Sequence, residues 1–280
     1  MKQCSSCGLN SSEIALYCQS CGTAFATAAL DPNAPPLPIF ENEPVIRDSF
    51  LANDRKSRIF EIFLILFIAF GGSFLVSTHH LITGLPQEGG RDSFRWWYSI
   101  CRELGALVLL WYVLRRHLEG LSHIGLRWNA LDLALTPVLW ALCYAAYHVA
   151  HFFIWTYAGP LLDSRMDVRV ASYLFSDGVT AGTLLFGMLN PFYEELIVRA
   201  YLMTQLRRLG NNWVIVIAVS VLVQISYHFY QGTWAALSHI GEFLVLSIYF
   251  AITKRIVAPI LVHLAFDMWP TIYYLVRPIH

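Results

Sequence analysis

The sequence predicts an all-α membrane protein, a polytopic bundle of about seven transmembrane helices preceded by a small zinc ribbon with four cysteine ligands. Hydrophobic residues make up 56% of the chain and charged residues only 14%, whereas soluble domains carry about 25% charged residues. Several apolar runs reach the roughly 20 residues that a membrane-spanning helix needs. We therefore divide the 280 residues into a ribbon at 1–24, a proline-rich linker at 25–54 and a transmembrane domain at 55–280.

Two Cys-x-x-Cys pairs near the N-terminus supply the expected ligands of a structural zinc ion. These ligands are Cys4, Cys7, Cys18 and Cys21. Each pair is followed by a glycine, and each short knuckle lets two thiolates converge on one tetrahedral metal at about 2.3 Å. The segment resembles the small zinc ribbon at the start of many bacterial and archaeal membrane proteins. The alternative is a pair of disulfides, which the reducing cytosol disfavours.

The linker is expected to be extended and partly stiff because it is rich in proline. Its prolines are Pro32, Pro35, Pro36, Pro38 and Pro44. Seven apolar segments follow it, at about residues 59–82, 95–114, 132–157, 180–206, 213–231, 235–253 and 256–276. These segments are the predicted transmembrane helices.

Basic residues indicate how the segments are oriented in the membrane. If the segments alternate in direction, ten arginines and lysines near their ends lie on one side and five on the other. Cytoplasmic loops carry the excess of basic residues in membrane proteins. We therefore expect a multi-pass protein of the plasma membrane, in contact with lipid, whose N-terminus and ribbon are cytoplasmic. The ribbon could then dock a cytoplasmic partner.

The charge balance and the motifs exclude several functions. Lysine and arginine together number 19, as do aspartate and glutamate. A chain without a basic surplus cannot neutralise many phosphates, so nucleic acid is not expected as a main partner. The sequence has no glycine-rich phosphate loop and no Gly-x-Ser-x-Gly elbow. Nucleotide hydrolysis and serine acyl transfer therefore have no support.

The fourth apolar segment carries three charged residues at bilayer depth, Glu194, Glu195 and Arg199. Each such group costs roughly 2.5–3.5 kcal/mol on insertion scales, so each is expected to have a partner or a task. Glu195 and Arg199 lie one helical turn apart and are expected to form an ion pair. Glu194 points about 100° away from Glu195 and has no local countercharge, which makes it a functional candidate.

Two later segments place further polar groups at depth. His228 lies near the end of the fifth segment, and His263 and Asp267 share one face of the seventh. Counted at 1.5 Å per residue from the basic ends, these groups and Glu194 lie roughly 12–24 Å deep, which allows them to converge. Taken separately, His228 could cap a helix end, and His263 could pair with Asp267 inside the bundle.

These residues resemble the motifs of the CAAX protease and bacteriocin-processing family of intramembrane endopeptidases, also called the CPBP or ABI family. The family's Glu-Glu-x-x-x-Arg motif matches Glu194, Glu195 and Arg199. Its Phe-x-x-x-His motif matches His228, with Gln224 in the place of phenylalanine. Its His-x-x-x-Asn or His-x-x-x-Asp motif matches His263 and Asp267. The likeness extends from about residue 57 to the end of the chain.

The resemblance implies hydrolysis of a peptide bond inside the membrane. Glu194 and His228 would activate a water, with the glutamate as general base, and His263 and Asp267 would stabilise the oxyanion. The helix that carries the base would be braced by Glu195 and Arg199. The family has also been described as metal-dependent, so a zinc held by two histidines and a glutamate is a less favoured alternative.

The implied substrate is a hydrophobic or lipidated peptide or protein, because eukaryotic relatives release a tripeptide after a prenylated cysteine. A competing function is a non-catalytic membrane scaffold or immunity-type binding protein that recruits partners through the ribbon. Proton-coupled transport is a weaker alternative, since an intramembrane acid near histidines can relay protons. His239 and Glu242 stay open: they could line a water-filled cavity or form a hydrogen-bonded pair at the membrane interface.

Overall fold

The structure, a computed structural model, describes residues 2–3, 10–11, 44–83, 93–159 and 178–276. It divides into two compact units, Met1–Leu51 and Ala52–His280. In the first unit, strand β1 (Lys2–Gln3) pairs antiparallel with strand β2 (Asn10–Ser11). The four cysteines of the expected ribbon lie outside the described residues. The ribbon and its structural zinc therefore stay predictions.

Helix α1 (Pro44–Thr83) begins earlier than the sequence suggested. The linker was expected to reach residue 54, whereas residues 44–54 are helical. Proline suits the first turn of a helix, because the N–H that it lacks would have no intrahelical partner there. The remainder of the expected linker, residues 25–43, lies outside the described part of the chain.

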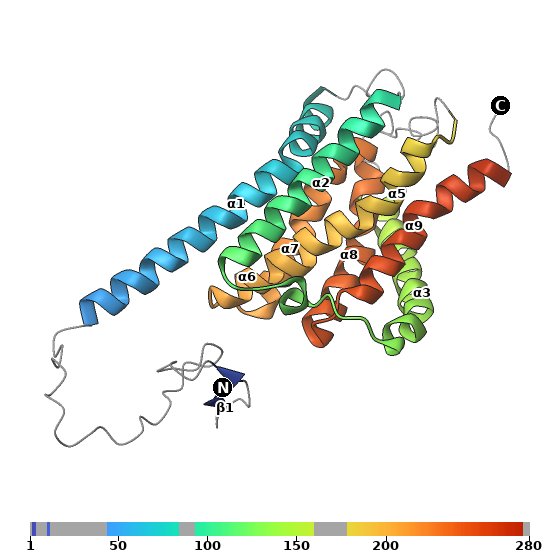
Figure 1. Ribbon diagram of the computed structural model, residues 1–280. Helices are drawn as coiled ribbons and strands as arrows, with labels where there is room; N and C mark the ends of the chain where they lie inside the picture. The colour runs from blue at the N-terminus through green and yellow to red at the C-terminus, as the bar shows by residue number, and fades with distance from the viewer. Residues whose placement is uncertain (1, 4–9, 12–43, 84–92, 160–177, 277–280) are drawn as a thin grey trace, which may run out of the picture. The chain divides into compact units, whose positions relative to one another are not determined.

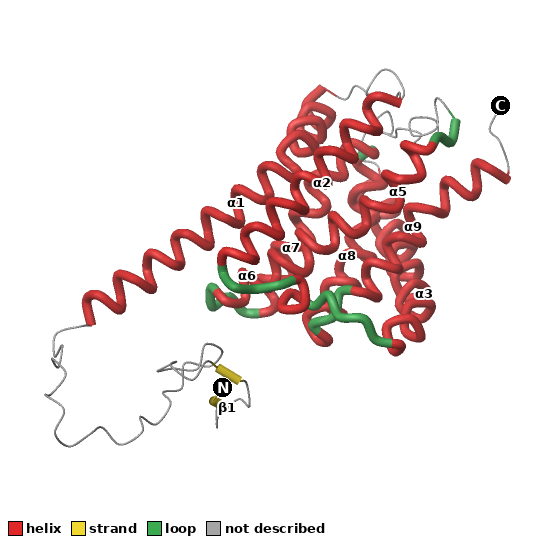
Figure 2. The backbone as a smooth tube through the Cα atoms, in the orientation of Figure 1, coloured by secondary structure: helices red, strands yellow, loops and turns green. Residues whose placement is uncertain are grey.

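Every described element of the second unit is helical (Figure 1). After α1 these elements are α2 (Ser93–Arg116), the short η1 (Leu121–Ile124), α3 (Ala130–Phe153) with its continuation η2 (Ile154–Ala158), α5 (Ala181–Glu194), η5 (Glu195–Leu202), α6 (Met203–Arg208), α7 (Trp213–His228), η6 (Phe229–Gln231), α8 (Thr233–Thr253) and α9 (Val257–Val276). Three of them, α5, η5 and α6, follow one another without a break as one long helix (Figure 2). The all-α prediction is confirmed for the described part of this unit.

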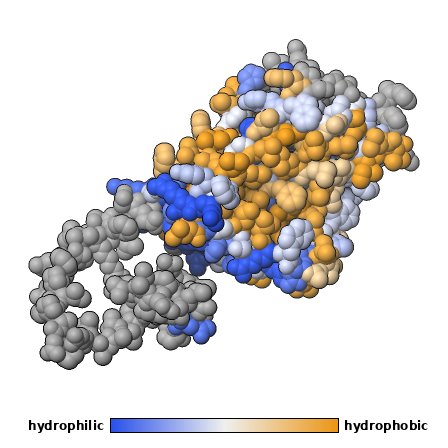
Figure 3. Space-filling model, viewed as in Figure 1, coloured by the Kyte–Doolittle hydropathy of each residue, from blue (hydrophilic) through white to orange (hydrophobic). Residues whose placement is uncertain are grey.

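Apolar helices identify a multi-pass membrane protein. Within the described residues, five stretches are long and apolar enough to cross a membrane: Arg55–Thr83, Phe94–Arg116, Ala130–Ala158, Trp213–Gln231 and Thr233–Thr253. The expected fourth and seventh segments are also helical, but they do not meet the same criteria. Hydrophobic side chains form a broad band on the face of the bundle in Figure 3. The count of seven spans stays a prediction.

Basic residues gather at one end of the bundle. Three ion pairs lie there: Arg116 at the end of α2 with Glu61 inside α1 (3.0 Å), Arg208 with Glu119 (2.5 Å) and Arg255 with Asp132 (2.7 Å). The pairs bring together the ends of α2 and α6 and the starts of α3 and α9, as helices of alternating direction require. The assignment of this basic end to the cytoplasm stays a prediction.

Helices α3 and α8 pack at close range. A Cβ atom at Gly241 of α8 would lie 2.1 Å from the carbonyl oxygen of Ala146 in α3, so only glycine leaves enough room. Small residues at helix interfaces allow this approach in membrane proteins. The contact places Tyr147 of α3 beside His239 of α8, with ring centroids 5.1 Å apart.

An aromatic cluster joins α1 to α5 and α7. The rings of Phe70 and Tyr227 stack, with centroids 4.3 Å apart and an interplanar angle of 9°. Tyr193 packs against Phe70 at 5.0 Å, and its hydroxyl donates to the carbonyl oxygen of Ala69 at 2.5 Å. All three aromatic side chains are buried. The cluster therefore holds Tyr227, the neighbour of His228, in one orientation.

Candidate active site

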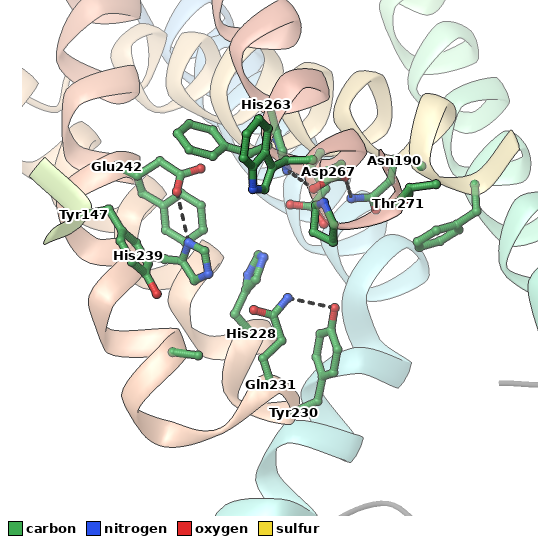
Figure 4. Close-up of a pocket in the computed structure, with 18 of the residues that line it drawn as sticks. Tyr147, Asn190, His228, Tyr230, Gln231, His239, Glu242, His263, Asp267 and Thr271 are labelled. Atoms are coloured by element: carbon green, nitrogen blue, oxygen red, sulfur yellow. Dashed lines mark hydrogen bonds and ion pairs between the residues drawn. The ribbon is translucent and has the colours of Figure 1, made fainter. Parts of the chain in front are cut away.

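A cavity of about 380 Å³ lies among the helices α3, α5, α8 and α9 and the end of α7 (Figure 4). All four residues predicted to be catalytic line it: Glu194, His228, His263 and Asp267. They come from three helices, α5, α7 and α9. The structure thus brings together the groups that the sequence placed at similar depths, while their catalytic roles stay predictions. We call this space the acidic cavity, because three acids line it: Glu194, Glu242 and Asp267.

Glu194 is the last residue of α5 and is buried, with 6% of its surface exposed. The Tyr227 hydroxyl donates to its Oε2 at 2.8 Å. The ion pairs that the described arginines form involve other acids. Glu194 also lines the acidic cavity.

Glu195 lies on the packed side of the same helix and is fully buried. Its Oε1 accepts hydrogen bonds from Arg199 and, at 2.9 Å, from Nδ1 of His263. The expected ion pair between Glu195 and Arg199 is therefore present. Both residues belong to η5, whose π-helical hydrogen bonds run from residue i to i+5. Such π-helical turns occur frequently at functional sites.

Gln224, the departure from the family motif, has a clear structural role. Its Oε1 accepts a hydrogen bond from Arg199 at 2.6 Å, which gives the buried guanidinium a second partner. Its backbone carbonyl accepts a hydrogen bond from Nδ1 of His228 at 2.7 Å. Because a carbonyl can only accept, Nδ1 carries the proton and Nε2 is the nitrogen left for the cavity. Figure 4 shows the His228 ring pointing into the cavity.

His263 and Asp267 form a third part of the site together with Asn190, which sequence reasoning missed. The Asn190 amide donates to Oδ2 of Asp267 at 3.0 Å, and Nε2 of His263 lies 3.5 Å from Oδ1 of the same carboxylate. Asn190 lines the cavity as well. It precedes Glu194 by four residues and so shares its helix face, a signal that was present in the sequence.

Tyr227 is the second residue that the sequence did not single out. Its contact with Glu194 joins α7 to α5, and its orientation depends on Phe70 of α1. No spacing along the chain relates these three residues. Only the packing of three helices could reveal that Tyr227 holds the candidate base.

His239 and Glu242, for which the sequence left two alternatives open, contact each other and also line the cavity. Nδ1 of His239 lies 3.0 Å from Oε2 of Glu242, and both residues line the acidic cavity. The His239 ring is also 5.7 Å from the ring of His228, centroid to centroid (Figure 4). The cavity wall opposite Asp267 is therefore polar as well.

Each histidine of the site has one ring nitrogen hydrogen-bonded to another protein group. His263 has one carboxylate oxygen beside each ring nitrogen, from Glu195 at 2.9 Å and from Asp267 at 3.5 Å. His228 uses one nitrogen for the Gln224 carbonyl. In the part of the chain that the structure describes, no group of three or more histidine, cysteine, aspartate or glutamate side chains is arranged to hold a metal ion. The zinc alternative stays a prediction.

A second cavity, of about 460 Å³, lies between α1, α2, α5 and the end of α7. It shares four lining residues with the acidic cavity: Phe186, Asn190, Glu194 and Tyr230. Arg95 and Arg102 of α2 line it, so we call it the arginine cavity. The candidate base thus lies in the wall between two cavities.

Comparison with known proteins gives one match. The family model described as type II CAAX prenyl endopeptidase Rce1-like matches residues 176–269. No curated protein and no solved structure matches the chain significantly. The matched segment contains all three motifs, and it ends within α9. The chain is therefore similar to type II CAAX prenyl endopeptidases over this segment, which supports the CPBP family of intramembrane proteases.

Proposed function

We propose that the protein is an intramembrane endopeptidase of the glutamate type that hydrolyses a peptide bond in a membrane-associated substrate. One observation carries this proposal: Glu194, His228, His263 and Asp267 line a single cavity inside a membrane protein. The family-model match over the same residues supports it.

Glu194 is the general base in this proposal. It accepts a proton from a water that also donates a hydrogen bond to Nε2 of His228. The water oxygen then attacks the substrate carbonyl carbon. The Tyr227 hydroxyl occupies Oε2 of Glu194, so the proton goes to the other oxygen. Glu194 then returns the proton to the amide nitrogen as the C–N bond breaks. The products are a new carboxyl group and a free amine.

His263 and Asn190 supply the hydrogen bonds that stabilise the oxyanion. Glu195 accepts the proton on Nδ1 of His263, and a second carboxylate, that of Asp267, lies beside Nε2. In this proposal the ring is therefore the doubly protonated imidazolium, whose Nε2–H is a donor on the cavity side. The contact of that nitrogen with Asp267, at 3.5 Å, is long for a hydrogen bond, so a developing oxyanion can compete for it. Asp267 orients both donors as an acceptor. Oxyanion donors of this kind each contribute about 10²–10³-fold to the rate.

The substrate is a hydrophobic or lipidated peptide or protein, including prenylated CAAX-like sequences. Aromatic side chains form much of the acidic cavity: Trp96, Tyr144, Tyr147, Phe186, Tyr230, Phe243, Phe266 and Trp269. The lining residues of α8 lie between Ala235 and Phe243, and those of α9 between His263 and Thr271, so the cavity occupies the half of the bundle away from the basic end. Substrate enters from that half.

Three further parts of the protein have supporting roles in this proposal: the ion pair beside the base, the basic end of the bundle and the N-terminal ribbon. Glu195 and Arg199 brace the helix that carries the base, and the basic end faces the cytoplasm of a cell with the protein in its plasma membrane. The N-terminal cysteines hold a structural zinc in a ribbon that a cytoplasmic partner can bind.

A cleavage assay with purified protein in liposomes tests the proposed activity. Hydrolysis of a fluorogenic hydrophobic peptide by the wild type is expected to be lost in Glu194→Gln and His228→Ala. The matched control is Met188→Leu on the same helix, because Met188 is 54% exposed on the lipid-facing surface. Wild-type rates in both site variants would instead favour the scaffold, and loss of proton-coupled uptake in Glu194→Gln would favour transport.

A further inference from the structure

The acidic and arginine cavities differ in charge, although they share Glu194 in their walls. Among the described residues that line the acidic cavity, three are acids and none is lysine or arginine. The described residues that line the arginine cavity include two arginines, Arg95 and Arg102, and one acid, Glu194. A peptide that passes Glu194 from one cavity to the other would therefore move from an acidic to a basic environment.

Arg102 is a charged residue far from the start of the apolar helix α2. It lies nine residues into α2, about 13 Å along the helix from Ser93. An arginine at such depth is costly unless it lines a polar cavity or has a partner. The sequence offers no acid one turn away from it on α2: the residues at positions 98, 99, 105 and 106 are uncharged.

The contacts of Arg102 are long, and one donor lacks an acceptor. Its NH1 group donates to Oγ of Ser73 at 3.3 Å, and its NH2 group lies 3.8 Å from Oε1 of Glu103. Its buried Nε–H has no hydrogen-bond partner among the described residues. Guanidinium groups bind carboxylates through two parallel hydrogen bonds at shorter distances. Arg102 therefore has unused capacity to bind an anion.

We propose that the arginine cavity binds the free C-terminal carboxylate of the substrate, with Arg102 as its main ligand. This inference rests on the proposed endopeptidase function. The cavity begins at Glu194, and an extended peptide spans at most about 3.3–3.6 Å per residue, so the carboxylate lies a few residues beyond the scissile bond. The longer, N-terminal part of the substrate occupies the acidic cavity and its aromatic wall.

A matched pair of peptides tests this carboxylate site. The two fluorogenic peptides are identical except that one ends in a free carboxylate and the other in a carboxamide. In neutral phosphatidylcholine liposomes, the full-length wild type is expected to cleave the carboxylate form with a kcat/KM at least about tenfold higher. Arg102→Gln is expected to lower the rate on the carboxylate form to that on the amide form, so that the preference between the two peptides is lost.

Two further variants separate a binding role from a structural one. Arg102→Lys keeps the charge and is expected to restore part of the preference for the carboxylate. Arg115→Gln removes an exposed arginine at the other end of the same helix and is expected to behave as wild type. Binding of both peptides to the Glu194→Gln protein gives a readout that does not need turnover, and the same preference is expected there.

Each other outcome overturns the inference. Equal losses on both peptides in Arg102→Gln, or no preference in the wild type, would show that Arg102 does not read the carboxylate. A rate on both peptides that depends on anionic lipid and loses this dependence in Arg102→Gln would assign the cavity to a lipid phosphate. Equal cleavage of both peptides that needs Glu194 would leave the proposed function standing. Cleavage of neither peptide, even with detergent added, would remove both.

Discussion

Two adjacent acids on one helix, Glu194 and Glu195, lie in contrasting regions of the molecule. Glu195 belongs to a packed region in which Arg199 and His263 both bind its carboxylate. Glu194 belongs to the cavity region, and a single tyrosine hydroxyl binds it. Both acids are buried, so burial alone does not mark a functional acid. Glu195 is paired with Arg199 and His263, whereas Glu194 lines a cavity, and this difference distinguishes the two acids.

We expect the largest loss of activity when Glu194, the acid of the cavity region, is replaced. Glu194→Gln keeps the shape of the side chain and its contact with Tyr227 but removes the base. We expect kcat to fall by roughly 10²–10⁴-fold, as is usual when a general base is lost, with an unchanged unfolding temperature. Peptide cleavage and thermal unfolding in the same detergent measure both quantities. A Glu194→Gln protein that is active, or that is inactive only because it is unfolded, would erase the distinction between the two regions.

The packed region predicts a loss of stability instead. Arg199→Gln leaves Glu195 buried with one cation fewer, and breaking a buried ion pair costs about 3–5 kcal/mol. Denaturant or thermal unfolding in detergent measures the change. The double variant Glu195→Gln and Arg199→Gln removes both charges and is expected to be more stable than Arg199→Gln alone. A double variant that is less stable than either single one would contradict this account of the pair.

A smaller effect is expected at Asn190, on the cavity side. Asn190→Ala removes an amide that donates to Asp267 and faces the proposed oxyanion. We expect kcat to fall by about 10²-fold with little change in KM, because the interaction strengthens only in the transition state. Steady-state kinetics with the fluorogenic peptide separate the two constants. A change confined to KM would assign Asn190 to substrate binding.

The smallest effect is expected at Tyr227. Tyr227→Phe removes the hydroxyl that donates to Glu194 and keeps the ring that stacks on Phe70. We expect activity to fall by about tenfold and the free energy of unfolding to change by no more than about 1.5 kcal/mol. Tyr193→Phe, which loses a hydroxyl bonded to a backbone carbonyl in the same aromatic cluster, serves as the control and should keep its activity. Equal losses in the two variants would point to packing rather than to the base.

The sequence could predict contacts within a helix more fully than contacts between helices. The pairing of Glu195 with Arg199 follows from their spacing of four residues, and Glu194 points elsewhere for the same reason. Charge at bilayer depth singled out the three segments that meet at the cavity. The four site residues were predicted to lie at similar depths, which is necessary for them to meet. It is not sufficient, because the ends and tilts of the helices cannot be read from the local sequence.

Partners that depend on tertiary packing could not be predicted. Tyr227 reaches Glu194 only because Phe70 of α1 fixes its ring, and Gln224 serves both Arg199 and His228 through two different atoms. The arginine cavity likewise needs α1 and α2 to lie against α5. The start of α1 was predicted too late for a local reason. Pro44 lies in the first turn of the helix but was assigned to an extended linker.

Cleavage in isotopically labelled water tests the central claim most directly. Purified protein in liposomes is given a hydrophobic peptide in H₂¹⁸O, and the products are analysed by mass spectrometry. The account predicts that the wild type puts one ¹⁸O atom into the new carboxyl group of each cleaved peptide, and that Glu194→Gln, correctly folded, yields no labelled product. Labelled product from Glu194→Gln at the wild-type rate, or none from the wild type, would contradict it.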